Sequence, residues 1–175
     1  LIFIINHSIL NAEDKNELSF GFAIGTGFME NVKITNSGND GIDLSGSTIT
    51  LKNIETSFIG DKSISVGENA IVKIENIDIK ESFIGIANKD GSKTIVLNSK
   101  INNTKIPLAS YKKKQSYGYG SLIIDGSFKV ENYMVKALKD KNSQIVIDNQ
   151  KFKKVSSNPL DIVYKKNIAL LNKIK

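Results

Sequence analysis

The stretch GDKSISVGE, at residues 60–68, places two carboxylates and a lysine between glycines, next to alternating apolar residues. Carboxylates and amines in one place can transfer protons, bind a cation, or pair with each other at a turn. Further charged groups occur upstream, at Asp40 and Asp43, and downstream, at Lys89 and Asp90. The chemistry open to these groups depends on whether the fold brings them together.

The composition limits the possible functions. The chain of 175 residues has no Cys, which excludes disulfides, thiolate chemistry and Cys-based zinc sites. All 24 basic residues are Lys, and because the bidentate contact of Arg is missing, specific recognition of nucleic acid is not expected. Residues 1–99 carry 8 lysines and 13 acids, whereas residues 100–175 carry 16 lysines and 5 acids. The basic half could bind an anionic polysaccharide or an acidic protein, or it could be a solvated lysine-rich surface.

An internal repeat with a spacing of 22 or 23 positions organises the chain. The segments STITLKNI (47–54), AIVKIENI (70–77) and KTIVLNSK (93–100) align at a spacing of 23. The aligned positions are Ile49, Val72 and Ile95; Leu51, Ile74 and Leu97; and Asn53, Asn76 and Ser99. Alternating apolar residues in short, regularly repeated strands with Gly, Asn and Asp between them predict an all-β parallel solenoid. Stacked copies of Asn53 and Asn76 are expected to form an asparagine ladder at a turn.

The repeat continues on both sides of these three segments. SLIIDGSF (121–128) aligns with QIVIDNQK (144–151) at the same spacing of 23. The step from Ile95 to Leu122 is longer than one coil, which predicts an insertion in the loop that contains residues 112–115. Upstream, ENVKITNSGNDGIDL (30–44) aligns with KNIETSFIGDKSISV (52–66) at a spacing of 22, so the coils extend back through at least Asn31.

The two ends of the chain are expected to differ from the coils. The opening LIFIINHSIL is too short for a membrane span and lacks the flanks of a signal peptide. It begins within an expected strand, so we expect the chain to be part of a longer protein. Its His7 has no second His or Cys and is expected to be a packed or surface residue, not a metal ligand. We expect the solenoid over residues 1–155 and a C-terminal cap or linker over residues 156–175, because an open solenoid end exposes strand edges.

The coil length, the inward Ile, Val and Leu stacks and the Asn turn resemble the right-handed parallel β-helix of the pectin lyase-like superfamily. Four stretches in this order also resemble an uncharacterised bacterial group of right-handed β-helix repeat proteins: NDGIDLSGS (39–47), GDKSISVGE (60–68), IGIANKDGS (84–92) and ASYKKKQSYGYG (109–120). This resemblance implies an extracellular or cell-surface module within a larger bacterial protein, with polysaccharide and neighbouring domains as partners.

Stacking at this period is expected to gather the charged residues into one patch, since a spacing of 22 sets Asp40 beside Lys62 and Glu68 beside Asp90. The candidate ligand-binding residues are Asp40, Asp43, Asp61, Lys62, Glu68, Lys89 and Asp90. Two arrangements are open. The charges could pair with each other and seal the corners of the coils, or they could face a groove that binds carbohydrate.

The resemblance also implies an enzymatic alternative. Polysaccharide lyases of this fold remove a proton next to a uronate carboxylate, which requires a basic side chain and a positive group or Ca²⁺. Neighbouring acids are expected to raise the pKa of Lys62 and Lys89, which argues against these two as bases. Lys113 and Lys114 are better placed as bases, and Tyr111 could act as the acid.

The leading hypothesis is a noncatalytic module that binds carbohydrate or supports other domains. The alternative is a polysaccharide lyase, hydrolase or epimerase with its site in the patch. Metal binding is the weakest hypothesis. The acids of the patch could offer oxygen ligands to Ca²⁺, but no EF-hand spacing is present and no other cofactor is indicated.

Overall fold

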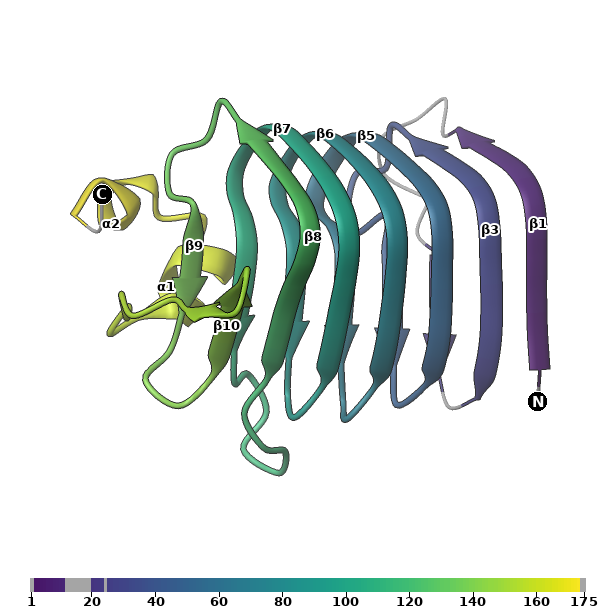
Figure 1. Cartoon of the computed structure of the whole chain (residues 1–175). Coiled ribbons are helices and arrows are strands. Elements are labelled where there is room, and N and C mark those ends of the chain that lie inside the picture. Colours follow the sequence, from purple (N-terminus) through teal and green to yellow (C-terminus); the bar gives the residue numbers. More distant parts are fainter. Residues whose placement is uncertain (1, 12–19, 24, 174–175) are drawn as a thin grey trace.

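The computed structural model describes residues 2–11, 20–23 and 25–173 of the chain, and side chains from residue 25 to 172. The chain winds into a parallel β-solenoid of about six turns (Figure 1), as the repeat predicts. The strands are β1 (Ile2–Asn11), β2 (Phe20–Ala23), β3 (Thr26–Thr35), β4 (Ile42–Ser45), β5 (Thr48–Gly67), β6 (Ile71–Lys89), β7 (Lys93–Tyr111), β8 (Ser121–Glu131), β9 (Ala137–Lys139), β10 (Gln144–Ile147) and β11 (Gln150–Lys151). Two short helices follow, α1 (Pro159–Tyr164) and α2 (Ile168–Lys173).

Each coil pairs with the next through parallel main-chain hydrogen bonds, in the order β1, β3, β5, β6, β7 and β8. Alternate side chains of each coil therefore point into the interior and stack on their counterparts. One such column consists of Ile42, Ile64, Ile86 and Leu108, which pair in register and are fully buried. Burying an aliphatic side chain of this size contributes about 1.5–3 kcal/mol. These columns form the hydrophobic core.

The register between β6 and β7 differs by one residue from the predicted alignment. Val72 pairs with Thr94 and not with Ile95, and Ile74 pairs with Val96 and not with Leu97. Because side chains alternate between the two faces of a strand, a shift of one residue reverses which of them point inward. Ile95 is accordingly 44% exposed, whereas Val96 is fully buried.

A β-bulge in β5 makes the spacing between β5 and β6 differ along the strand. Ile59 pairs with Ser82, but Lys62 pairs with Ile84, so the spacing between partners becomes one position shorter along this strand. One extra residue therefore lies between Ile59 and Lys62, where Asp61 occurs, and bulges of this kind bend a strand and redirect its side chains. The spacing of 23 in the first part of β5 does not carry over to the next coil, because the partners in β6 and β7 are 22 positions apart throughout.

The loop at residues 112–120 accommodates the predicted insertion. It separates β7 from β8. Leu122 of β8 pairs with Thr94 of β7, and not with Ile95 as predicted. The alignment beyond the loop is correct, because Leu122 pairs with Ile145. A short antiparallel hairpin, β10 with β11, follows.

The asparagine ladder is longer than the pair predicted from the sequence. The side-chain Nδ2 of Asn53 donates to Asn31 Oδ1 at 3.0 Å, and that of Asn76 donates to Asn53 Oδ1 at 3.0 Å. Asn98, and not the predicted Ser99, donates to Asn76 Oδ1 at 3.3 Å. All four asparagines have positive φ, a conformation that Asn tolerates better than most residues, so the ladder also sets a corner of each coil.

The segment expected to be a cap or linker contains α1 and α2. Their Ile162, Val163 and Leu171 pack against Phe83, Ile84 and other apolar residues on the outer face of the solenoid. In Figure 1 the two helices lie together near the end of the solenoid formed by β8 to β10. Among the residues that the structure describes, no helix is long and apolar enough to cross a membrane. The side chain of His7 lies outside the described part of the chain.

We predict that Asn76→Ala destabilises the protein by about 2 kcal/mol. The substitution removes two ladder hydrogen bonds, and alanine tolerates the positive φ of this position less well than asparagine does. Asn76→Gly should cost less, because glycine adopts this φ freely. Urea unfolding monitored by circular dichroism measures both. An unchanged midpoint for Asn76→Ala would show that the ladder contributes no stability.

Candidate functional site

Lys62 pairs with two other residues of the predicted patch, Asp40 and Asp61. Its Nζ lies 3.1 Å from Asp40 Oδ1 of the preceding coil and 2.5 Å from Asp61 Oδ2. The backbone N–H of Lys62 also donates to Asp40 Oδ1, at 3.2 Å. Lys62 is only 3% exposed. Burial alone would lower the pKa of Lys62, but the carboxylates of Asp40 and Asp61 raise it above its ordinary value, in the direction expected from the sequence.

Lys89 forms the second part of the predicted patch. Its Nζ donates to Ser65 Oγ at 2.8 Å, and Ser65 pairs in register with Asp43. Burial lowers the pKa of Lys89, the attraction of Asp43 opposes this shift, and the nearby positive charge of Lys62 adds to it. The expectation that neighbouring acids raise the pKa of Lys89 is therefore wrong, because desolvation outweighs them.

Asp90 and Glu68 hold in place the loop at residues 112–120, which we call the lysine loop. Asp90 is 1% exposed, and its Oδ1 accepts the backbone N–H groups of Lys113 and Lys114, both at 2.7 Å. The ammonium of Lys114 pairs with Glu68 at the surface. Asp90 therefore satisfies two main-chain donors of the loop, an arrangement that acids commonly adopt in turns.

Tyr111 lies beneath helix α1. Its side chain is fully buried, and its hydroxyl is 3.2 Å from the hydroxyl of Tyr164, with the two rings edge to face. Burial raises the pKa of Tyr111 well above its ordinary value, and Tyr164 adds to this shift. Lys62 Nζ lies 5.6 Å and Lys113 Nζ 4.5 Å from the centre of the Tyr164 ring, and both distances are within the range of cation–π attraction.

The sequence pattern correctly brings the patch together, but it does not reveal Tyr164. This residue lies far beyond Lys62 in the chain, outside the repeat, so no coil spacing relates the two. The same holds for Lys166, whose Nζ donates to the backbone oxygen of Gly60 at 3.1 Å. The C-terminal segment thus closes over the corner where Lys62 pairs with Asp40 and Asp61.

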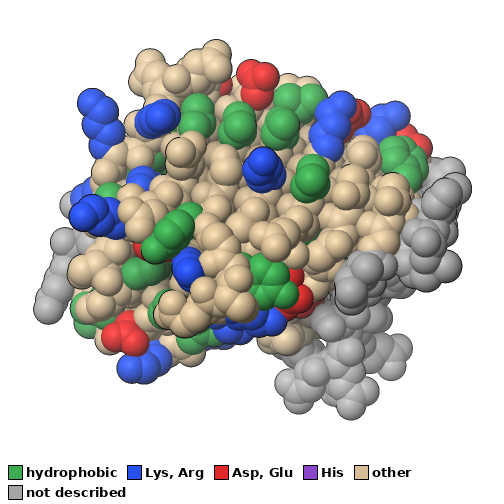
Figure 2. All heavy atoms as spheres, turned by 90° about the horizontal axis from the view of Figure 1, so that it is seen from below, with side chains coloured by type: hydrophobic (Ala, Val, Ile, Leu, Met, Phe, Trp, Pro, Cys, Tyr) green, Lys and Arg blue, Asp and Glu red, His purple; other side chains and the backbone are tan. Residues whose placement is uncertain are grey.

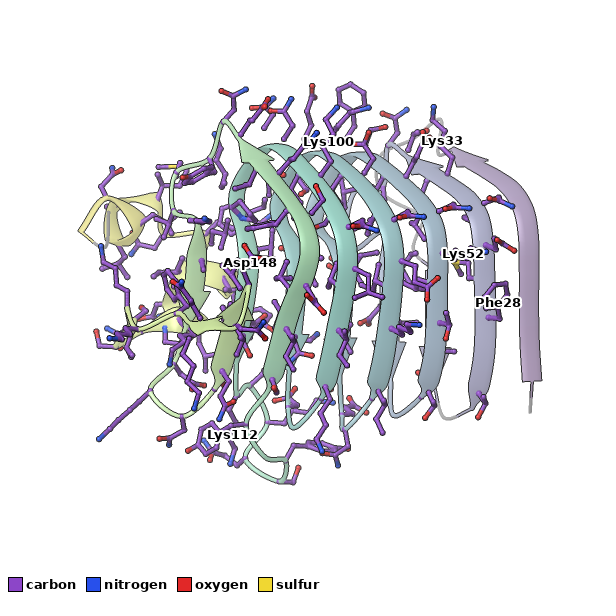
Figure 3. The ribbon with its side chains drawn as sticks, in the orientation of Figure 1. Phe28, Lys33, Lys52, Lys100, Lys112 and Asp148 are labelled. Carbon is purple, nitrogen blue, oxygen red and sulfur yellow. The ribbon has the colours of Figure 1, made fainter. Side chains whose placement is uncertain are left out.

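A cavity of about 870 Å³ opens beside the lysine loop. We call it the loop cavity. Its lining comes from the lysine loop, from residues 140–142 and from residues 155–161: Lys112, Gln115, Tyr119, Asp140, Lys141, Asn142, Val155, Ser156, Ser157, Asn158, Pro159, Leu160 and Asp161. In Figure 3, Lys112 lies at the lower edge of the solenoid, and Figure 2 shows this lower side, where lysines are scattered among acidic and uncharged side chains.

Two features give the loop cavity a defined wall. Tyr119 is 47% exposed, with Lys112 Nζ 5.2 Å from the centre of its ring. Asp140 fixes the opposite side: one of its carboxylate oxygens accepts the N–H of Lys112 at 2.7 Å, and the other accepts the N–H groups of Asn142 and Ser143. The sequence analysis does not single out Tyr119 or Asp140 as site residues. The one sequence feature that could have indicated Tyr119 is its position between two glycines in the inserted loop.

No group of three or more metal-binding side chains with suitable geometry occurs in the described part of the chain. Comparisons with models of known protein families, with curated proteins and with solved structures yield no significant match. The solenoid itself is what the structure establishes, and the resemblance to the pectin lyase-like superfamily rests on the sequence motifs.

We predict that the protein loses stability as the pH rises above 10, the ordinary pKa of tyrosine. In this range the unfolded chain releases the Tyr111 proton while the folded protein keeps it, so the unfolded state binds fewer protons and is favoured. Lys62 and Tyr164, whose pKa values are also raised, act in the same direction. Thermal unfolding of the wild type and of Tyr111→Phe from mildly to strongly alkaline pH measures the effect.

The Tyr111→Phe variant should show a shallower decline in melting temperature over this pH range, whatever its stability at neutral pH. Tyr133→Phe is the matched control, since Tyr133 is 43% exposed, and it should decline as the wild type does. Equal slopes for the wild type and Tyr111→Phe would contradict the burial of the Tyr111 hydroxyl.

Proposed function

We propose that this protein is a noncatalytic β-solenoid module that binds a carbohydrate in the loop cavity. The observation that carries the proposal is an exposed tyrosine ring, Tyr119, in a cavity whose volume lies within the range of small-molecule sites. An aromatic ring offers a flat apolar surface for a sugar face, and Gln115, Asn142 and Asn158 supply donors and acceptors for hydroxyl groups.

The charge of the cavity favours an acidic sugar. Lys112 and Lys141 line the loop cavity and belong to the half of the chain in which lysines greatly exceed acids. Asp140 accepts hydrogen bonds from three backbone N–H groups, and Asp161 pairs with Lys165 at 2.9 Å, so both acids of the lining have partners that offset their negative charge. We infer a polysaccharide with carboxylate groups as ligand, and a secreted or cell-surface bacterial protein as the setting, as the motif resemblance implies.

The paired state of the charged patch supports a noncatalytic role. Lys62 has two carboxylate partners, and the backbone of the lysine loop occupies Asp90. The enzymatic alternative has Lys113, Lys114 and Tyr111 as catalytic residues. One specific observation favours it, and it concerns Lys89, which lies close enough to Lys113 for their charges to interact. Burial lowers the pKa of Lys89, as a general base requires.

We predict that the wild type binds an acidic polysaccharide such as polygalacturonate or alginate, and that Tyr119→Ala weakens binding by roughly tenfold, the loss of about 1.4 kcal/mol. Tyr133→Ala is the control, because it removes a comparably exposed tyrosine that does not line the loop cavity. Affinity electrophoresis in gels containing each polysaccharide measures the difference.

Two outcomes would overturn the proposal. Equal retardation of the wild type and Tyr119→Ala would remove the loop cavity as the site. Unsaturated product, detected by ultraviolet absorbance after incubation with the same polysaccharides with or without Ca²⁺, would show a lyase in place of a binding module.

A further inference from the structure

A second surface feature follows the asparagine ladder. A groove of about 420 Å³ crosses β5, β6, β7 and β8 at the corner that the ladder forms. One wall consists of Asn53, Asn76 and Asn98, and the other is a row of charged side chains. We call it the ladder groove. It shares no lining residue with the loop cavity.

The asparagine wall is a fixed set of hydrogen-bonding groups. Each amide donates one N–H along the ladder, and the Oδ1 of Asn98 accepts the N–H of Ser127 at 3.1 Å, which ends the series. An amide nitrogen carries two hydrogens and its oxygen accepts two bonds, so every amide keeps one donor and one acceptor for a ligand. Because the ladder already orients these amides, binding does not have to order them.

The charged wall changes sign along its length. Glu55, Asp78, Lys100 and Lys129 occupy one register position in four successive coils. Glu55 lies 3.6 Å from Lys33, and Asp78 lies 3.2 Å from Lys80, so both acids have cationic partners. Figure 3 shows Lys33 and Lys100 along the same upper edge of the solenoid.

The two lysines differ from the two acids. Neither Lys100 nor Lys129 forms an ion pair with any residue in the described part of the chain, and both are exposed. They pair directly in register, which sets their backbones ~4.8 Å apart. Like charges directly opposite each other on neighbouring strands are destabilising. A bound anion between the two ammonium groups would relieve this repulsion.

We propose that the ladder groove binds a hydroxyl-rich chain that carries an anionic group. The anion lies between Lys100 and Lys129, and hydroxyl groups bond to the amides of Asn53, Asn76 and Asn98. The amides repeat with the coils, at ~4.8 Å, which is close to the length of one sugar unit. An extended peptide presents its groups every ~3.4 Å and does not match this repeat. The inference is independent of the loop cavity and makes the protein a two-site module.

The anion could be a carboxylate of a uronic acid or a phosphodiester between polyol units. Isothermal titration of the wild-type chain with a galacturonate trimer and with a short poly(glycerol phosphate) separates these two sources. A glucose trimer serves as the uncharged probe. We expect at least one anionic probe to bind, and the glucose trimer to bind roughly tenfold more weakly than that probe.

The decisive variant is K100E/K129E, which reverses both charges at the end of the groove. Measured in the Tyr119→Ala background, so that the loop cavity contributes little, it should weaken binding of the anionic probe by roughly tenfold or more. The control K93E/K105E makes the same change in net charge at two exposed lysines of β7 outside the groove, and it should bind within about twofold of the wild type. Circular dichroism verifies that both variants fold.

A third variant, Tyr119→Ala, keeps this test separate from that of the loop cavity. Binding at the ladder groove is unchanged in Tyr119→Ala, whereas binding at the loop cavity is weakened roughly tenfold. The inference is overturned if no anionic probe binds the wild type, or if K100E/K129E and K93E/K105E bind equally well. It is also overturned if Tyr119→Ala abolishes all binding, since the loop cavity would then be the single site.

Discussion

Main-chain hydrogen bonds between neighbouring coils decide which side chains of this protein meet. Each strand pairs in parallel with the same strand one coil away, so positions one repeat apart in the sequence become neighbours at ~4.8 Å. The apolar columns, the asparagine ladder and the charged patch are consequences of this one constraint. A single added residue is tolerated because the bulge between Ile59 and Lys62 absorbs it before the coil ends.

The constraint has an electrostatic cost at Lys62. Removing an ammonium and its carboxylates from water costs several kcal/mol per ion, and their attraction offsets this only when geometry and hydrogen bonding are good. Here Asp40 receives both the ammonium and the backbone N–H of Lys62, and the ring of Tyr164 faces the same ammonium. The patch is therefore best understood as a buried network that fixes adjacent coils and the C-terminal helices to one another.

The outer face of the solenoid changes character along its length. The position of Lys62 is taken by Ile84 in the next coil and by Ile106 in the one after, and helices α1 and α2 cover these apolar side chains. Helix α1 ends beside the charged coils, with Tyr164 at the boundary. The two proposed ligand sites, the loop cavity and the ladder groove, do not include these covered side chains.

Much of this organisation could be predicted from the sequence, because the repeat fixes neighbours without knowledge of long-range packing. The period correctly places Asp40 against Lys62, Asn53 against Asn76 and Leu122 against Ile145. The alignment fails at Ile95 because Thr94 is a polar residue at an inward position, and a search for matching apolar residues therefore shifts by one.

Contacts made by segments outside the repeat could not be predicted in this way. Tyr164 and Lys166 reach the patch from a tail with no counterpart in the coils, and their partners depend on tertiary packing alone. The expected direction of the Lys89 pKa shift is wrong for a related reason. The number of acids nearby can be read from the sequence, whereas the burial that outweighs them cannot.

The central claim, that Lys62 pairs with Asp40 and Asp61 beneath the C-terminal helices, can be tested by acetylating the lysines of the native protein and quantifying each site by mass spectrometry. Lys62 should react far more slowly than Lys114, which is paired only at the surface, and the two should react alike in urea. If Lys62 is acetylated as fast as Lys114 in the native protein, the patch is open to solvent and the account is wrong.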